Sequence, residues 1–409
     1  MSNTLTVLDM VARESLRIAH EKATFLGTVN RQYDDSFKEK GWKQGASLRV
    51  ANPNQYTRRQ GSRVMDVQDQ DESTQTITVA TQDGVDMRFN SAELTLNTAS
   101  PDEVAAFSKR YIEPAMSVLV SGIEGDVLQD CIKKTYNTVG TAGTVVGASG
   151  DITALYNARA KLNQQLAPKD GNRSIQLDSV TMASVANGIK SLFHEGKQIE
   201  EAFREGFIAR TAMADIYENE RTWSLTNGSD VTSVTLDTYT VVDGDSTLTI
   251  TGATGVAEGA VFTIAGVYDC HPETKQAYSH LKQFTVLSGS TDTALIISPT
   301  IYLTGAKKNV ASASGGTAAP STTAALVFHG AASTTYRQNL MCHKDAFAFV
   351  TADLPLMDDA AKCVRRVQDG LSVRVWTASD IRNDELLMRL DILYGWKALR
   401  PEWACRISN

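Results

Sequence analysis

The chain changes composition abruptly after Arg221, and no further arginine occurs before Arg337. The intervening stretch is rich in threonine, serine, valine, alanine and glycine, and residues 230–335 carry four lysines against eight acidic residues. It contains short runs in which apolar and polar residues alternate, separated by glycine and aspartate turns. Such runs predict an all-β barrel or sandwich. Because mixed helical and strand patterns lie on both sides, we predict a β domain inserted over residues 228–335.

The same alternation predicts the core of this inserted domain, since every second side chain of a strand points to one face. A segment with its own strands and composition should have its own core and fold as a unit. Residues 305–325 are of low complexity and predict a mobile connection. The predicted core residues are Ile250, Val261, Phe262, Ile264, Phe284 and Val286.

A long helical pattern precedes the insertion. Ser100 and Glu103 fit a capping box, and apolar residues then recur at steps of three and four as far as Asn137. Pro114 lies inside this pattern, so we expect a bend or break near residues 110–114. A helix of this length suggests a structural spine.

The residues before this helix, 42–99, predict a hairpin with a long polar approach. Residues 76–81 and 85–89 alternate, and Asp83 and Gly84 between them give a strong signal for a tight hairpin turn. The polar segment that precedes these runs has few core-forming residues. The hairpin should therefore project into solvent or lie on a partner.

The polar approach carries arginines first and acidic residues immediately after. Its one aromatic residue, Tyr56, would allow stacking on nucleic acid bases. Opposite charges laid end to end instead favour pairing with another copy of the chain. The predicted inter-subunit contact residues of the hairpin are Arg58, Arg59, Arg63, Asp66, Asp69, Asp83 and Gly84.

Charge and composition exclude several other classes of protein. The formal net charge of −7 argues against a protein whose main task is gripping nucleic acid phosphates. No stretch approaches the ~20 apolar residues of a membrane span, so no membrane is expected as a partner. The five cysteines are scattered and odd in number, which predicts reduced thiols.

No motif for catalysis or for binding a cofactor or metal is complete. Gly196 and Lys197 lack the spacing of a phosphate-binding loop, and His194 with Glu195 lacks the second histidine of a zinc-protease helix. We therefore expect no enzyme activity, no cofactor and no metal.

The body around the insertion mixes helices and strands. A helix is expected over residues 152–166 and a strand over residues 174–180, and two late strands are expected to pair across a turn at residues 377–385. The amphipathic pattern at residues 3–27 predicts a helix that packs on its own core or reaches a neighbouring subunit as an arm.

The order of these parts resembles the major capsid proteins of tailed bacteriophages with the Hong Kong 97-like fold, and especially short-tailed-phage coat proteins that carry an inserted β-barrel. The run Arg204–Arg210 and the run Gly252–Val267 carry part of the resemblance. The most specific part is a C-terminal motif formed by Tyr394, Gly395, Arg400, Pro401 and Glu402.

The resemblance implies a mixed α+β fold and a structural function. The chain would self-assemble as hexamers and pentamers into an icosahedral shell around packaged double-stranded DNA, without sequence-specific DNA binding. A scaffolding protein and a portal would be partners, and the shell would form in the host cytoplasm and remain as the virion capsid. The implied parts are an N-terminal arm (1–41), an extended loop (42–99), a peripheral domain with the spine helix (100–139), an axial domain (140–227), the inserted barrel (228–335) and a return to both domains (336–409).

One departure from these relatives lies at Asp243–Gly244–Asp245, where a long loop that contacts the neighbouring capsomer is reduced to a turn. Two other classes of protein stay open at this point. One is an α/β enzyme with a β accessory domain, which would need a convergent catalytic set. The other is a β-rich phage tail or adhesin protein, against which the spine helix argues.

Overall fold

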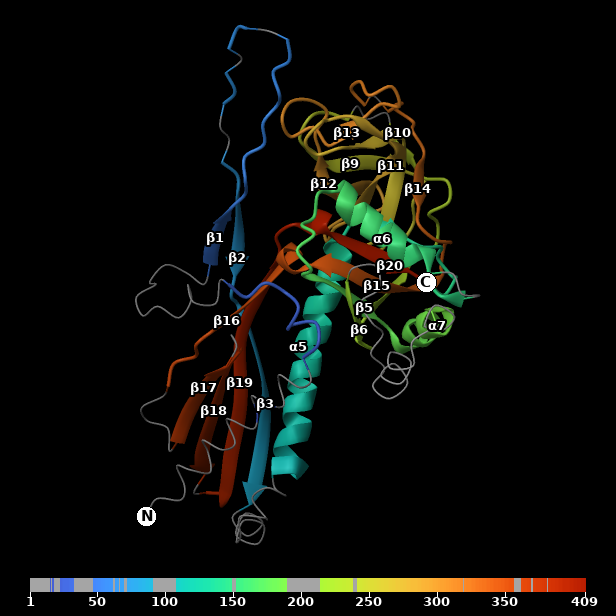
Figure 1. Ribbon diagram of the computed structural model, residues 1–409. Coiled ribbons are helices and arrows are strands. Elements are labelled where there is room, and N and C mark those ends of the chain that lie inside the picture. Colours follow the sequence, from blue (N-terminus) through green and yellow to red (C-terminus); the bar gives the residue numbers. More distant parts are fainter. Residues whose placement is uncertain are drawn as a thin grey trace. The chain divides into compact units, whose positions relative to one another are not determined.

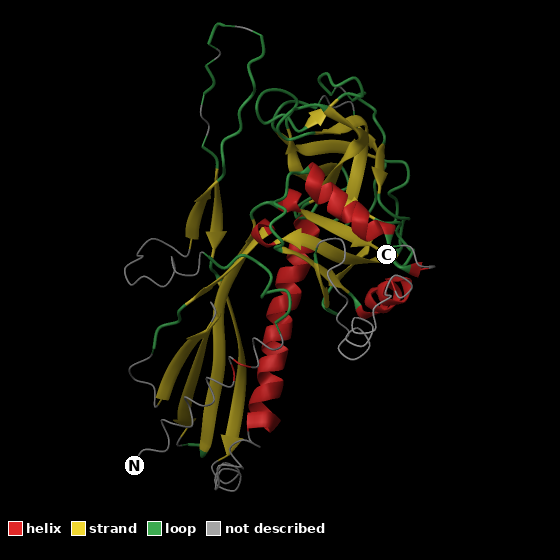
Figure 2. Cartoon of the chain, in the orientation of Figure 1, coloured by secondary structure: helices red, strands yellow, loops and turns green. Residues whose placement is uncertain are grey.

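The computed structural model describes residues 15, 17, 23–32, 47–61, 63–65, 67–69, 72–90, 108–148, 152–189, 214–237, 241–318, 320–356, 362–368, 371–380 and 382–409. The described chain is a mixture of helices and strands in which strands predominate (Figures 1 and 2). Its contacts divide it into two units. The first comprises Met1–Val50, Gln75–Val127 and Phe347–Lys397, and the second comprises Ala51–Thr74, Leu128–Ala346 and Ala398–Asn409.

The first unit is built on an antiparallel sheet in the order β16-β19-β18-β17, with β3 also paired to β19. One face of this sheet is apolar, and Val375 and Leu390 on it are fully buried. The strands are β3 (Thr81–Asn90), β16 (Phe347–Ala352), β17 (Lys362–Gln368), β18 (Leu371–Asp380) and β19 (Glu385–Ala398). The pairing of β18 and β19 extends as far as Asp380 and Glu385, so the predicted turn at residues 377–385 is shorter than expected.

The long helix α5 runs over Glu113–Lys134, and a π-helical turn at Ser108–Ile112 precedes it. The change of helix type falls directly before Pro114, which has no N–H to donate to the preceding turn. The expected irregularity at residues 110–114 is therefore present. The helix ends at Lys134 rather than at Asn137, and its expected start at Ser100 lies outside the described residues.

Residues 23–30 of the N-terminal arm pack on the first unit of the same chain. Both carboxylate oxygens of the buried Glu124 accept hydrogen bonds from the backbone, at 2.8 Å from Thr24 N and 3.1 Å from Phe25 N. Asn30 forms a parallel bridge with Ala348 of β16. The remainder of the predicted arm helix lies almost entirely outside the described residues.

The predicted hairpin turn at Asp83 and Gly84 is wrong. Both residues lie inside β3, which pairs with β19 from Thr81 to Asn90. Glycine is needed at residue 84 because the side chain of the cross-strand residue, Asp391, occupies the space of a Cβ. The actual hairpin joins β1 (Ser47–Ala51) to β2 (Thr74–Thr78) through the long polar segment.

The second unit contains a mixed sheet in the order β4-β20-β15-β5-β6, with β7 also paired to β15. Helices α6 (Thr153–Gln164) and α7 (Ser179–Ile189) belong to this unit, and buried residues of both share a core with the sheet. Because α7 begins at Ser179, the strand predicted over residues 174–180 ends earlier than expected. The strands are β4 (Thr138–Val139), β5 (Arg173–Leu177), β6 (Asp215–Glu218), β7 (Trp223–Thr226), β15 (Thr335–His343) and β20 (Ala404–Ser408).

A second sheet of the same unit closes on itself as a barrel. Its pairings run β8-β9-β12-β11-β10-β14, and an antiparallel bridge between Thr235 and Ala325 joins the last strand to the first. Backbone hydrogen bonds from Leu236 N to Ala324 O (2.9 Å) and from Leu326 N to Val234 O (2.9 Å) flank that bridge. The strands are β8 (Thr235–Leu236), β9 (Asp245–Thr251), β10 (Val261–Cys270), β11 (Ala277–Val286), β12 (Ala294–Ile301), β13 (Val310–Ala311) and β14 (Leu326–Phe328).

The barrel encloses one cluster of buried apolar side chains. It includes Ile250, Phe262, Ile264, Phe284 and Val286, whereas Val261 is buried at 4% exposure but lies outside this cluster. The expectation of a mobile connection over residues 305–325 is wrong in part. Val310–Ala311 form the strand β13, pair with Tyr268 and Asp269 of β10, and are fully buried.

Candidate assembly interface

The loop between β1 and β2 holds its shape through hydrogen bonds of its own. At its base, Asn52 N donates to Ser73 O at 2.9 Å. Farther along, Thr57 N donates to Gln68 Oε1 at 2.8 Å, and Gln68 Nε2 donates back to Thr57 O at 2.7 Å. These bonds connect the two arms of the loop, and within its described residues no side chain is fully buried.

The predicted contact arginines lie in this loop. Arg58 Nη2 donates to Gln60 Oε1 at 3.1 Å, and Arg59 Nη1 donates to the carbonyl oxygen of Val64. Arg63 and Asp69 are exposed. Asp66 lies outside the described residues. Two of the three arginines thus help to shape the loop as well as carrying its charge.

Three apolar side chains near the tip of the loop were missed by the sequence reasoning. Val64, Met65 and Val67 are exposed at 76%, 79% and 77%. Apolar side chains gathered in one exposed segment mark an interaction surface. The signal was present in the run Val64-Met65-Asp66-Val67, but the surrounding charges drew the interpretation toward ion pairs.

Asp83 and Gly84 belong to the first unit and make contacts inside the chain. Tyr394 Oη donates to Asp83 Oδ2 at 2.6 Å, and burial together with this carboxylate raises the pKa of Tyr394. Gly84 lies opposite Asp391 in the sheet. The structure therefore does not place these two residues in the loop with the arginines.

The C-terminal motif has structural contacts in both units. In the first, the ring of Tyr394 stacks on Trp396, and a Cβ at Gly395 would collide with the carbonyl oxygen of Thr78. In the second, Pro401 opens a short 3-10 turn, Pro401–Trp403, and the guanidinium of Arg400 lies 4.2 Å from the centre of the Trp403 ring.

The last member of the motif, Glu402, is held inside the second unit. Its backbone carbonyl accepts a hydrogen bond from Asn137 Nδ2 at 3.3 Å. Burial raises the pKa of its carboxyl group. Tyr394, Gly395, Arg400 and Glu402 therefore serve the packing of the chain itself.

The described residues offer no set of groups for catalysis at a metal. They contain no cluster of three or more histidine, cysteine or acidic side chains that could hold a metal ion. All five cysteines are free thiols, and burial raises the pKa of Cys342 to about 11 and that of Cys405 to about 12, which makes both poor nucleophiles. Within the described part of the chain, no helix is both long and apolar enough to cross a membrane.

An exposed hairpin loop, a long helix and a closed barrel are features of a structural protein that works by assembly. Residues 76–406 match the family described as P22 coat protein, gene protein 5, and the chain belongs to this family. It is a major capsid protein of a tailed bacteriophage, built into the capsid in multiple copies, and not an enzyme. Membership of this coat protein family confirms the prediction of a mixed α+β capsid protein with the Hong Kong 97-like fold, and both alternatives, the enzyme and the tail or adhesin protein, are wrong.

Several solved structures match most of the chain at low sequence identity. A structure of Mycobacterium phage Che8 matches with a TM-score of 0.48 at 11% identity, covering 94% of this chain and 90% of that one. The capsid of cyanophage P-SCSP1u matches with a TM-score of 0.41 at 9% identity, covering 93% and 88%. A virus-like particle from Pyrococcus furiosus matches with a TM-score of 0.41 at 9% identity, covering 98% of both chains. Comparison with curated protein sequences gives no match.

Proposed function

We propose that copies of this chain form hexamers and pentamers of an icosahedral shell that encloses packaged double-stranded DNA. A scaffolding protein and a portal take part in its assembly in the host cytoplasm, and the shell persists as the virion capsid. The net charge of −7 supports a container that does not grip its contents, because a strongly basic inner surface would bind DNA tightly.

The extended loop is the observation that carries this proposal. The described residues of the loop are connected by their own hydrogen bonds, yet they expose Val64, Met65 and Val67 as well as Arg63 and Asp69. An ordered, exposed segment of this composition is suited to burial on a second copy. The loop therefore lies across the adjacent subunit, where its apolar tip is buried and its arginines face acidic side chains.

The other segments take the roles that the resemblance implies. The arm (1–41) and the spine (100–139) with the return strands support the peripheral domain, residues 140–227 form the axial domain at capsomer centres, and residues 228–335 form the inserted barrel. The turn at Asp243–Asp245 is bound to its own barrel, since Asp243 Oδ1 accepts from Leu303 N at 2.6 Å and Asp245 Oδ2 from Val242 N at 2.6 Å. It supports a barrel that serves folding more than contact between capsomers.

The test of assembly is sedimentation velocity and electron microscopy of the purified chain, alone and with the products of its neighbouring genes. We expect shells, tubes or capsomer-sized oligomers. A chain that stays strictly monomeric at high concentration under both conditions would contradict the proposal.

The role of the loop is tested by two triple variants, R58E/R59E/R63E and V64S/M65S/V67S. Each should block assembly while leaving the circular dichroism and thermal unfolding of the monomer unchanged, because the loop has no core of its own. The matched control K169E/R337E/K344E reverses three exposed charges outside the loop and should assemble normally. If both loop variants assemble like the wild type, residues 52–73 are solvated surface.

A further inference from the structure

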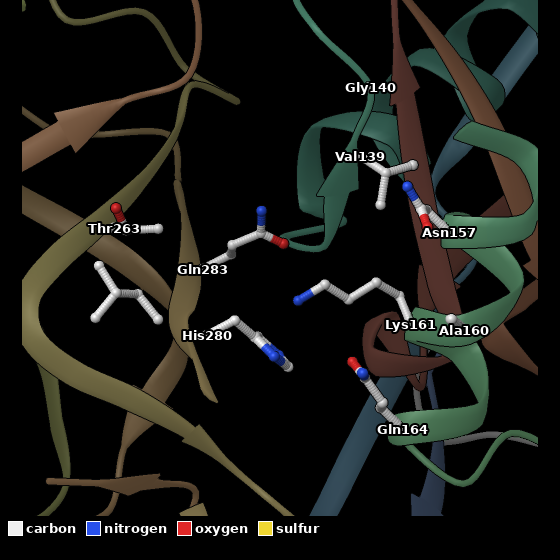
Figure 3. Close-up of a pocket in the computed structure, with 10 residues that line it drawn as sticks. Val139, Gly140, Asn157, Ala160, Lys161, Gln164, Thr263, His280 and Gln283 are labelled. Atoms are coloured by element: carbon white, nitrogen blue, oxygen red, sulfur yellow. The ribbon is translucent and has the colours of Figure 1, made fainter. Parts of the chain in front are cut away.

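A cavity of about 530 Å³ lies in the second unit between helix α6 and the barrel. Figure 3 shows side chains converging on it from α6 on one side and from strands β10 and β11 on the other. Its size falls in the range of small-molecule sites. It is lined by Val139, Gly140, Asn157, Ala160, Lys161, Gln164, Thr263, His280, Leu281 and Gln283, a set that contains no acidic side chain.

Lys161 extends its ammonium group into this cavity (Figure 3). Among the described residues, its Nζ has no hydrogen-bond or ion-pair partner. The side chain is half-buried, and burial lowers the pKa of Lys161. Asp269 attracts this ammonium group electrostatically but makes no hydrogen bond or ion pair with it. A partly desolvated ammonium group without a direct anionic contact favours the entry of an anion.

The neighbouring carboxylate, Asp269, is already saturated. Its Oδ1 accepts from Lys282 Nζ at 2.8 Å and from Cys270 N at 2.9 Å, while its Oδ2 accepts from Gln165 Nε2 at 3.0 Å and lies 3.3 Å from His280 Nε2. These four contacts occupy the lone pairs of the carboxylate. Asp269 therefore has no lone pair left to accept a hydrogen bond from Lys161 Nζ, and an external anion could still bind there.

Two glutamine side chains of the cavity differ in whether their amide groups already have hydrogen-bond partners. Gln283 is fully engaged with Thr138, whose N donates to Gln283 Oε1 at 3.0 Å and whose O accepts from Gln283 Nε2 at 2.9 Å. Gln164 Oε1 is buried and has no hydrogen-bond partner within the described structure. A ligand that satisfies the cavity must therefore bring acceptor oxygens for Lys161 and a donor for Gln164.

We propose that this cavity binds a phosphate group that still carries a proton, either inorganic phosphate or a phosphate monoester. Inorganic phosphate has several acceptor oxygens for Lys161 and keeps, at neutral pH, an O–H that can donate to Gln164 Oε1. A phosphate monoester, whose second pKa is about 6, has this O–H only as its monoanion. Sulfate has no such proton at neutral pH, and an internal phosphodiester of DNA has none either. The bound group would connect α6 to β10 and β11, and so stabilise the attachment of the barrel to the sheet of the second unit.

The site is tested by isothermal titration of the full-length chain, in its unassembled form, with inorganic phosphate, adenosine monophosphate and sulfate at a pH of about 6, where roughly half of a phosphate monoester carries the proton. We expect binding of the first, the second or both, with sulfate at least about tenfold weaker because the hydrogen bond to Gln164 is lost. If only inorganic phosphate binds, the cavity selects the free ion. Binding of the nucleotide shows that its remaining volume accepts an organic group.

Two variants assign the binding to Lys161. K161Q should weaken phosphate binding by at least about tenfold, whereas K169Q, which removes an exposed lysine just beyond α6, should bind like the wild type. Both should unfold at the wild-type temperature without phosphate, and added phosphate should raise that temperature for the wild type and K169Q alone. Equal affinity of K161Q and the wild type, equal binding of sulfate and phosphate, or no binding at millimolar concentration would each overturn the proposal. None of these outcomes depends on shell assembly.

Discussion

The carboxylate of Asp391 lies directly over the backbone of Gly84, its partner across strands β19 and β3. A Cβ at residue 84 would lie 2.6 Å from Asp391 Oδ1 and 2.7 Å from the carbonyl oxygen of Leu390. From this position Asp391 reaches Arg374 Nη2 at 2.6 Å and Arg389 Nε at 3.3 Å. The side chains of Arg374 and Asp391 are 4% and 1% exposed, so a shift of the carboxylate would leave a buried charge without its partner.

Replacing Gly84 by alanine should therefore destabilise the first unit. The added methyl group must displace either the backbone of Leu390 or the carboxylate of Asp391, and overpacking of this kind costs about 1–3 kcal/mol. The free energy of unfolding in urea measures the effect. G122A is the matched control, since a Cβ at this exposed position of α5 meets no atom within 4 Å and improves helix propensity. Equal stability of G84A and the wild type would show that Asp391 can move without cost.

Gly84 also shows where sequence reasoning failed and why. An aspartate–glycine pair between alternating runs is the usual mark of a tight turn, and nothing local distinguishes it from a glycine that makes room for a residue 307 positions later (391 − 84). Asp83 has the same explanation, because its partner is the hydroxyl of Tyr394. The sequence marks both residues as unusual, but each is explained by a contact with the distant strand β19.

The barrel was easier to predict because its core follows from local alternation. What alternation could not supply was closure, which depends on a single bridge between Thr235 and Ala325. Strand β15 was not predicted either. Its residues Gln338–His343 are buried on both faces, so the strand has no amphipathic pattern to detect. The cavity at Lys161 could not be predicted from local patterns either, because its lining comes from elements far apart in the sequence, namely α6, β4, β10 and β11.

The core of the barrel should depend strongly on Phe262. Its ring lies 5.8 Å from that of Phe284 and 5.3 Å from that of Phe328, between centroids, and it is 1% exposed. F262A should cost about 3–5 kcal/mol, enough to unfold a marginally stable barrel. V327A on β14, where the side chain is 61% exposed, should change little.

The independence of the barrel can be measured on the same variant. Residues 228–335 expressed alone should give a cooperative β-type thermal transition, and F262A should abolish it. In the full chain the substitution should lower the yield of soluble subunit before it alters shell geometry. A fragment without cooperative unfolding would mean that the barrel depends on the rest of the second unit.

Arg406 of β20 should be the main polar connection between the barrel and the sheet of the second unit. It is fully buried, and its guanidinium donates to Gly259 O at 2.5 Å, Lys133 O at 2.7 Å and Thr285 Oγ1 at 2.9 Å. R406M would remove all three of these bonds. Gly259 O would lose the donor that Arg406 supplies, at about 1–3 kcal/mol if water cannot reach it, whereas Lys133 O would keep the bond from Thr285 Oγ1 at 2.9 Å. Urea unfolding should show a large loss for R406M and a smaller one for T285V, which removes the two bonds of the Thr285 hydroxyl, to Arg406 and to Lys133 O, but keeps the guanidinium bonds to Gly259 O and Lys133 O. Similar losses for both would mean that the guanidinium adds little beyond Thr285.

The surroundings of Arg406 also predict how stability depends on pH. Burial, and then the positive charge of Arg406, lower the pKa of His329 below its usual 6.5, and its Nε2 is buried without a hydrogen-bond partner. The folded chain therefore binds this proton less readily than the unfolded chain does. The resulting stabilisation is complete above pH 6.5 and is lost as the pH falls from there toward the lower pKa of the folded state.

Urea unfolding at pH 7.5, 6.5 and 5.5 should show this loss in the wild type and a smaller one in H329Q, which cannot be protonated. Asp269 does not contribute to the change in stability between pH 7.5 and pH 5.5. Its pKa is lowered by Lys282 and by hydrogen bonds from His280, Lys282 and Cys270, despite the opposing effect of burial, so its contribution is lost only as the pH falls through and below the usual carboxyl range near 4. A wild-type slope in H329Q would assign the pH dependence to other groups and show that His329 can be protonated beside Arg406 without cost.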